Sequence, residues 1–202
     1  MINKKNDKYD KIEKEFVEHI SHQLGIALDN IYRVKEQKRL LESFISAMAK
    51  TIDARHPDTV GHTTRVAEYS TKIAEKLELP PNRIELVRIA ALLHDYGKII
   101  TPDYILCKEG PLSPEEYEMM KEHALVTYQI LNGIDFPEEF KEIPDIAARH
   151  HERYDGEGYP FGEGKDELPI EAQILAVADV FDALISSRSY KDAGTGEAAK
   201  NM

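Results

Sequence analysis

A histidine, an aspartate and a lysine directly follow an apolar run in the middle of the chain. Residues 91–110 read ALLHDYGKIITPDYILCKEG, with His94 and Asp95 after the leucines and Lys98 three residues later. Burying such groups without partners costs several kcal/mol or shifts their pKa values. They therefore need a salt bridge, a hydrogen-bond network or a metal ion as a partner.

Several further imidazoles, and one carboxylate within an apolar segment, strengthen the interpretation that the chain binds a metal ion. A single histidine is more often structural than a ligand, but here several occur together. Adjacent residues on a helix point about 100° apart, so a pair such as His94-Asp95 can bracket two ions or hold one between them. A carboxylate inside the apolar run 174–181 is costly unless a cation compensates it. The candidates outside the central motif are His62, His123, His150, His151 and Asp179.

Lys98 lies on the same helical face as His94 and Asp95. A metal site repels an ammonium group unless an anion lies between them, and a bound phosphate is such an anion. The alternative is a simple ion pair between Lys98 and Asp95. The pattern thus indicates phosphate chemistry but leaves the ion pair open.

The composition excludes some classes of partner. The chain has 202 residues and a formal net charge of −11, from 26 basic and 37 acidic side chains. Nucleic-acid binding depends on clustered Lys and Arg, so we expect no nucleic-acid partner. No signal peptide and no run of eighteen apolar residues is present, and Cys107 is the single cysteine. We therefore expect a cytoplasmic protein without a disulfide and without a membrane partner.

A heptad pattern runs from Ile20 to Ile52, interrupted by the polar Lys38. It predicts one long helix, which forms either a parallel homodimeric coiled coil or a helix packed on its own domain. We assign residues 1–52 to this N-terminal linker helix and residues 53–202 to a globular domain.

The sequence pattern of the globular part predicts an all-α fold. Apolar periodicity, prolines and a capping box at Ser113 predict its helices, and no stretch alternates with the period of a strand. Residues 154–169 contain too many glycines and prolines for an element and are expected to form a long functional loop. The predicted helices are 66–77, 84–93, 113–131, 137–151 (broken or restarted at Pro144) and 170–186.

Two motifs in this sequence resemble those of a known family. His94-Asp95 followed by Gly97-Lys98 resembles the H-D-x-G-K signature of the HD superfamily of metal-dependent phosphohydrolases, and Gly158-Tyr159-Pro160 resembles the mark of its HD-GYP branch. The similarity extends from about residue 47 to 191. It implies a helical bundle that binds two or three iron or manganese ions and hydrolyses cyclic di-GMP to pGpG and GMP. The ligand types suit both metals.

The resemblance also implies roles for individual residues. Asp95 bridges the two ions. From the charge arrangement we expect Lys98 to contact the substrate phosphate and to protonate the leaving 3'-oxygen. Asp58 occupies the position of a glutamate that binds a third ion in some members, although it is a shorter carboxylate. The ligands implied for the first ion are His62, His94, Asp95 and Asp179, and for the second His123, His150 and His151.

The remaining implied contacts concern substrate and partners. Arg188 and Lys191 match a pair of phosphate-contacting cations, although the surrounding residues differ from the usual pattern. Tyr159 either stacks on a base of the substrate or only shapes the turn that orients His150 and His151. The family also uses this loop to bind signalling proteins, and the N-terminal helix resembles the linker after a GAF-type sensor. Alternative functions are hydrolysis of another nucleotide, a non-catalytic cyclic dinucleotide sensor, and a coiled-coil scaffold.

Overall fold

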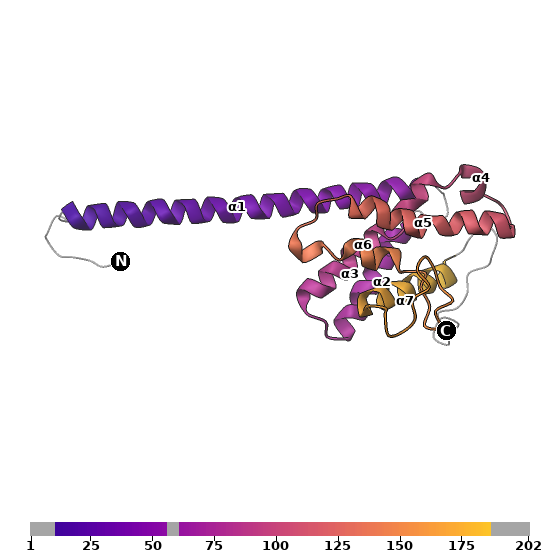
Figure 1. The fold of residues 1–202 in the computed structure, drawn as a ribbon. Helices are drawn as coiled ribbons and strands as arrows, with labels where there is room; N and C mark the ends of the chain where they lie inside the picture. The colour runs from indigo at the N-terminus through magenta and orange to yellow at the C-terminus, as the bar shows by residue number, and fades with distance from the viewer. Residues whose placement is uncertain (1–10, 56–60, 187–202) are drawn as a thin grey trace. The chain divides into compact units, whose positions relative to one another are not determined.

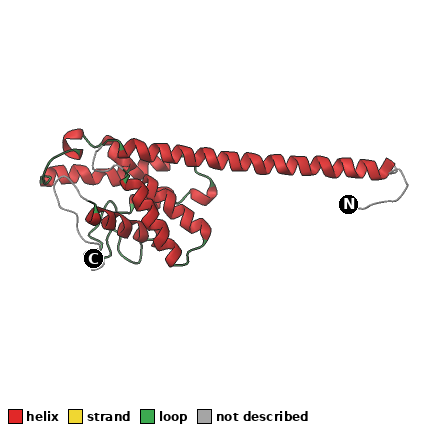
Figure 2. Ribbon diagram, turned by 180° about the vertical axis from the view of Figure 1, so that it is seen from behind, coloured by secondary structure: helices red, strands yellow, loops and turns green. Residues whose placement is uncertain are grey.

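The described part of the chain is entirely helical. The computed structural model describes residues 11–55 and 61–186, and within these ranges every regular element is a helix and none is a strand (Figures 1 and 2). The all-α prediction is therefore confirmed. No helix in these ranges combines the length and the apolar character that crossing a membrane requires.

The chain divides into two compact units after Phe44. Helix α1 spans Lys11–Asp53, so it begins nine residues before the predicted heptad and ends one residue after it. Its residues up to Phe44 belong to the first unit and its last turns to the second. The domain boundary that the sequence predicts at residues 52 and 53 stays a prediction.

The second unit contains six further α-helices and two short 3-10 helices within residues 61–186. The α-helices are α2 (His62–Lys76), α3 (Pro81–Leu93), α4 (Asp103–Leu106), α5 (Pro114–Asn132), α6 (Ile143–Ala148) and α7 (Ile170–Ile185), and the 3-10 helices are η2 (Tyr96–Ile100) and η3 (Glu138–Phe140).

Local sequence signals explain where several of these helices begin. Proline lies in the first turn of α3, α5 and α6, where its missing N–H costs nothing. At the start of α5 the capping box is complete: Ser113 Oγ accepts from the Glu116 amide at 3.2 Å, and Glu116 Oε2 accepts from the Ser113 amide at 2.7 Å. These signals are local, which is why the sequence predicts α3 and α5 to within a few residues.

Helices α2, α3, α6 and α7 pack around one core. Ala74 of α2, Val87 of α3 and Ile174 of α7 form a buried cluster, with Ile84 at its edge. Several alanines on these helices are fully buried, and their small side chains let the backbones approach closely. The core thus fixes α7 and the ends of α3 and α6, which position several of the predicted site residues.

The structure corrects one expectation about helix ends and confirms another. The predicted helix 137–151 consists of η3 and the short helix α6, with Pro144 in the first turn of α6 and with His150 beyond its end. Helix α3 ends at Leu93 as predicted, so His94 and Asp95 lie in the turn between α3 and η2. Helix ends leave their last carbonyls unpaired, and these carbonyls are used by the histidines described below.

Gly97 allows η2 to lie directly against α5. A Cβ atom at this position would be 1.9 Å from the His123 carbonyl oxygen and 2.6 Å from the Thr127 amide nitrogen. The Gly97 amide donates to Thr127 Oγ1 at 2.8 Å, and the same hydroxyl donates to the His94 carbonyl at 3.0 Å. This contact keeps the segment around Asp95 beside His123.

Replacing Gly97 should therefore be costly. We expect Gly97→Ala to lower the free energy of unfolding by at least about 2 kcal/mol, because the clash is with backbone atoms that cannot rotate away. Gly164→Ala is the matched control, since its added Cβ would meet only the Tyr154 carbonyl at 3.6 Å. Urea unfolding of the two variants measures the difference, and equal stabilities would contradict the role of this close approach.

Candidate metal centre

Five imidazoles and two carboxylates meet in the second unit, from elements far apart in the sequence. His62 begins α2, His94 and Asp95 follow α3, and His123 lies in α5. The others, His150, His151 and Asp179, follow α6 or lie in α7. His94 is completely buried, and His62, His123 and His150 are at most 4% exposed.

The first group of converging ligand atoms belongs to His62, His94 and Asp179. One side-chain atom of each lies within 4.8 Å of the others. The His62 Nε2 to Asp179 Oδ1 distance is 3.3 Å, and the His94 Nε2 to Asp179 Oδ1 distance is 3.8 Å. Two imidazoles and a carboxylate at this spacing match the donor set of a transition-metal ion.

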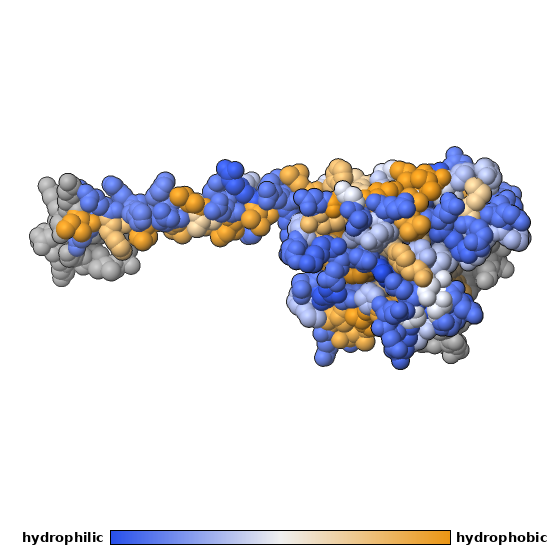
Figure 3. Space-filling model, viewed as in Figure 1, coloured by the Kyte–Doolittle hydropathy of each residue, from blue (hydrophilic) through white to orange (hydrophobic). Residues whose placement is uncertain are grey.

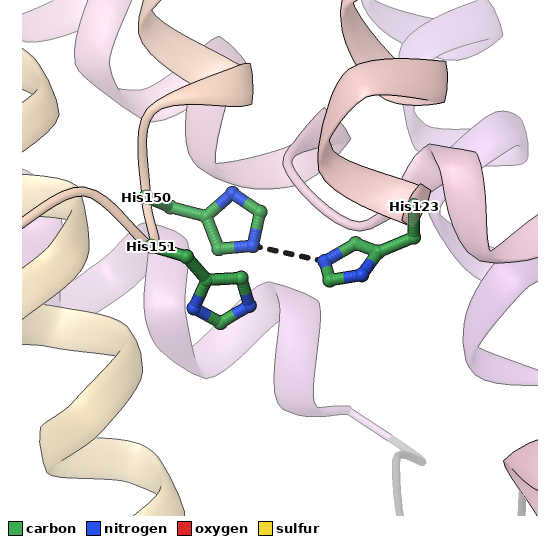
Figure 4. Close-up of side chains that lie close together, drawn as sticks. All are labelled: His123, His150 and His151. Atoms are coloured by element: carbon green, nitrogen blue, oxygen red, sulfur yellow. Dashed lines mark hydrogen bonds between the residues drawn. The ribbon is translucent and has the colours of Figure 1, made fainter. Parts of the chain in front are cut away.

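The second group consists of His123, His150 and His151 (Figure 4). The Nε2 atoms of His123 and His150 are 3.3 Å apart. His151 lies beside both rings, with ring centroids 4.0 Å from His150 and 5.2 Å from His123. Three imidazoles facing one another give a second donor set next to the first.

Asp95 lies between the two groups. Its Oδ2 is 3.7 Å from His62 Nε2 and 3.5 Å from His94 Nε2, whereas its Oδ1 is 3.4 Å from His123 Nε2. The Oδ1 atom is also 3.8 Å from His150 Nε2. Each oxygen of this 4% exposed residue thus faces one group, which is the arrangement of a carboxylate that bridges two ions.

The backbone orients the rings so that one nitrogen of each remains available. The Nδ1 atoms of His94, His123 and His150 contact the carbonyl oxygens of Ala91, Met120 and Ala147 at 2.6, 2.6 and 2.8 Å. A hydrogen bond from Nδ1–H to a carbonyl leaves Nε2 unprotonated and free to bind a metal. The buried Nε2 of His94 has no hydrogen-bond partner among the described residues, so the donor set fits a cation.

The protonation states differ between the groups. Burial and the nearby Lys98 ammonium lower the pKa of His123 to about 4, and burial with the neighbouring His123 lowers that of His151 to about 3. Burial also lowers the pKa of His62, but its hydrogen bonds with Asp179 and Asp182 outweigh this effect and raise it to about 9. Without metal, the second group is thus neutral at pH 7 and His62 is charged.

Lys98 forms the ion pair that the sequence left open. Its Nζ is 2.5 Å from Asp95 Oδ2, because residues three apart in a 3-10 helix lie above one another. Burial raises the pKa of Asp95, but Lys98 and the surrounding histidines together outweigh this and keep it well below its usual range. The ammonium group therefore lies at the edge of the centre.

The loop after His151 is fastened to the centre through Glu152. This buried carboxylate accepts from the amides of Phe161, Gly162 and Glu163 at 2.6, 3.2 and 3.0 Å. Gly158 lies so close that a Cβ would be 2.5 Å from the Arg153 nitrogen. The loop thus folds back on the residues that follow the histidine pair.

Tyr159, which precedes the cis peptide bond to Pro160, packs on the histidines. Its ring centroid is 4.7 Å from that of His151 at an interplanar angle of 36°, and 6.4 Å from that of His123. One face of the ring is thereby occupied by His151, which favours the alternative that this tyrosine orients the histidines.

Sequence reasoning missed Asp182. This buried residue accepts from His62 Nδ1 at 2.8 Å and from Arg65 Nε at 2.7 Å, so it fixes the ring of His62. The available signal was its position three residues after Asp179 in an apolar helix. Three residues of the predicted site, Asp58, Arg188 and Lys191, lie outside the described residues.

The fold and centre are those of a known family. The HD domain family model matches residues 46–202, and the chain belongs to this family. The predicted resemblance is thus confirmed, and the buried His and Asp clusters are consistent with the metal site of an HD domain.

Two individual relatives are similar to this chain over most of its length. The cyclic di-GMP phosphodiesterase response regulator RpfG of Xanthomonas campestris pv. campestris is 41% identical over 85% of this chain and 44% of its own length. The 3'3'-cGAMP-specific phosphodiesterase 2 of Vibrio cholerae is 34% identical over 93% of this chain and 36% of its own. The chain thus spans less than half the length of these two relatives.

A solved structure agrees with the fold. The HDG"Y"P protein of Bdellovibrio bacteriovorus superimposes with a TM-score of 0.58 at 25% identity, covering 69% of this chain and 44% of that one.

The charge of His62 gives a test of the first group. We expect Mn²⁺ binding to release about one proton at pH 7 and about half a proton at pH 9, because the metal replaces the proton on a ring with a pKa of about 9. Calorimetry in buffers of different ionisation enthalpy measures this number. Asp182→Asn should move the midpoint to lower pH, and binding without proton release at pH 7 would contradict the assignment.

Proposed function

We propose that the chain is a metal-dependent phosphodiesterase that hydrolyses cyclic di-GMP to pGpG and GMP in bacterial second-messenger signalling. The observation that carries the proposal is the position of Asp95, whose two oxygens face two separate groups of imidazoles. This supports a two-ion centre of iron or manganese with Asp95 as the shared ligand. His62, His94 and Asp179 complete one site, and His123, His150 and His151 complete the other. Asp58 stays a prediction for a third ion.

The proposed reaction requires the side chains mainly to hold the metal ions and to supply charge beside the phosphodiester. Bound transition-metal ions supply Lewis acidity that activates water and neutralises charge on a phosphodiester. The neutral imidazoles of the second group are ready to bind without first losing a proton. Helix ends and core packing hold all ligands on rigid elements, which keeps their geometry fixed during the reaction.

Lys98 is the side chain proposed to act on the reacting phosphate. Its ammonium lies 2.5 Å from Asp95 Oδ2 and is one-fifth exposed, so it faces both the centre and an incoming anion. It can stabilise charge on a nonbridging oxygen and donate a proton to the leaving 3'-oxygen. Arg188 and Lys191 are proposed to bind the second phosphate, and Tyr159 to line the substrate side of the centre.

The substrate could also be a related cyclic dinucleotide. The relatives named above include both a cyclic di-GMP enzyme and a 3'3'-cGAMP-specific enzyme, and the contacts proposed for Lys98 are with phosphate rather than with bases. We favour cyclic di-GMP because, of these two relatives, the cyclic di-GMP enzyme has the higher sequence identity to this chain. The loop at Gly158-Tyr159-Pro160 is proposed to contact signalling proteins as well.

Anaerobic metal loading followed by chromatography of the products tests the function. Cyclic di-GMP, 3'3'-cGAMP and cyclic di-AMP are supplied in parallel, with Asp95→Ala as the inactive control. Faster turnover of 3'3'-cGAMP would reassign the substrate. Saturable binding without product, with either iron or manganese fully loaded, would establish a sensor instead.

Removing the ammonium group of Lys98 tests its role in catalysis separately from metal binding. We expect Lys98→Met to lower kcat by about a hundredfold or more while the metal content stays at the wild-type value, because the side chain supplies charge and a proton but no ligand atom. Elemental analysis and steady-state kinetics measure the two quantities. Full turnover in this variant would exclude the role.

The exposed heptad of α1 supports a proposed homodimer. Within the first unit Ile20, Leu24, Ile31 and Val34 are 50–64% exposed, and apolar residues appear along this part of α1 in Figure 3. Such a seam is more stable against a second helix than in water.

We expect Ile31→Asp to convert a dimer to a monomer in sedimentation experiments, since it places a charge in the seam. Tyr32→Asp is the matched control, because this residue is 68% exposed and lies about 100° around the helix from Ile31, outside the heptad positions. A monomeric wild-type protein would contradict the proposal.

A further inference from the structure

The end of α1 contacts two segments of the metal centre. Its last turns are part of the second unit, where Ile45, Ala49 and Ile52 are 2%, 6% and 7% exposed. The helical hydrogen bonding continues past Asp53, because the Ala54 amide donates to the Lys50 carbonyl and the Arg55 amide to the Ile52 carbonyl, both at 3.0 Å. Asp53 and Arg55 are thus anchored on a packed helix end.

Arg55 holds the backbone of η2. Its guanidinium donates to the carbonyl oxygens of Lys98, Ile99 and Thr101 at 2.5, 2.9 and 2.9 Å, and to Asp103 Oδ1 at 2.6 Å. The planar fork of five donors suits several carbonyls at the end of a short helix. Arg55 therefore fixes the turn that carries Lys98, in addition to the Gly97 contact with α5.

Asp53 holds the start of α2. Its Oδ2 accepts from the Gly61 amide at 3.1 Å, and its Oδ1 accepts from the Thr63 hydroxyl. These two residues flank His62, and a carboxylate at a helix N-terminus is favourable because it meets unpaired amides. Asp53 therefore fixes the turn that presents His62.

The two contacts reach different segments. Asp53 is the last residue of α1 and contacts the start of α2, whereas Arg55 lies in the turn that follows and contacts η2 and the residues after it. One movement of this end would change the position of His62 relative to Lys98.

We propose that Asp53 and Arg55 are positioning residues through which the end of α1 sets His62 and Lys98 in the metal centre. The proposal rests on the proposed function for its catalytic readout only. Neither side chain is assigned contact with the metal or the substrate: Asp53 acts through His62, and Arg55 acts through Lys98.

Two variants should therefore fail in different ways. Arg55→Met should lower kcat by about tenfold or more at unchanged metal content, and speed hydrogen exchange of the amides at 97–101. Asp53→Asn should weaken Mn²⁺ binding by about tenfold and speed exchange at 61–64, with kcat near wild type at saturating metal. Asp103→Asn is the control for Arg55, because it removes only the exposed ion pair and should leave all readouts unchanged.

A double-mutant cycle tests whether Arg55 acts through Lys98. Arg55→Met should cause no further loss of kcat in a Lys98→Met background, whereas independent effects would add. Equal changes in both variants, or none, would overturn the proposal, since general loosening does not discriminate between the segments. If the wild type hydrolyses no cyclic dinucleotide, the proposed function fails, yet Mn²⁺ titration and hydrogen exchange still decide between the two roles.

Discussion

The buried carboxylate of Asp95 is the constraint on which the rest of the structure depends. A carboxylate that is 4% exposed needs nearby positive charge, and the surrounding side chains provide one ammonium group and several imidazoles. Most of these imidazoles are neutral at pH 7, because burial lowers their pKa values. These neutral rings present unprotonated nitrogens beside a carboxylate, which is the chemical reason that the centre suits cations.

The helices serve this arrangement by ending near it. α3 and α6 stop just before His94 and His150, so that carbonyls of their last turns fix the rings. α5 contributes His123 from its middle, which is reachable only because Gly97 lets η2 lie against its backbone. A glycine in the motif is thus a packing requirement rather than a flexible joint.

The sequence predicts the helices and the ligand set for different reasons. Apolar periodicity and proline caps are local signals, so they predict α2, α3, α5 and α7 closely. The motif around His94 and Asp95 predicts the residues of the centre through family resemblance. η2 has only five residues, too few for a periodic signal, and its role depends on contacts with α5 and Arg55. Asp182 was missed because its partner His62 is 120 residues away in the chain.

The loop after His151 is held in place by its main chain rather than by its outer side chains. Three main-chain amides donate to the Glu152 carboxylate, so these hydrogen bonds belong to the backbone and form whatever side chains stand at 161 and 163. Only proline, which lacks the N–H, would remove the bond at either of these positions. The outer surface of the loop can therefore diversify between relatives while its path beside the histidines is preserved.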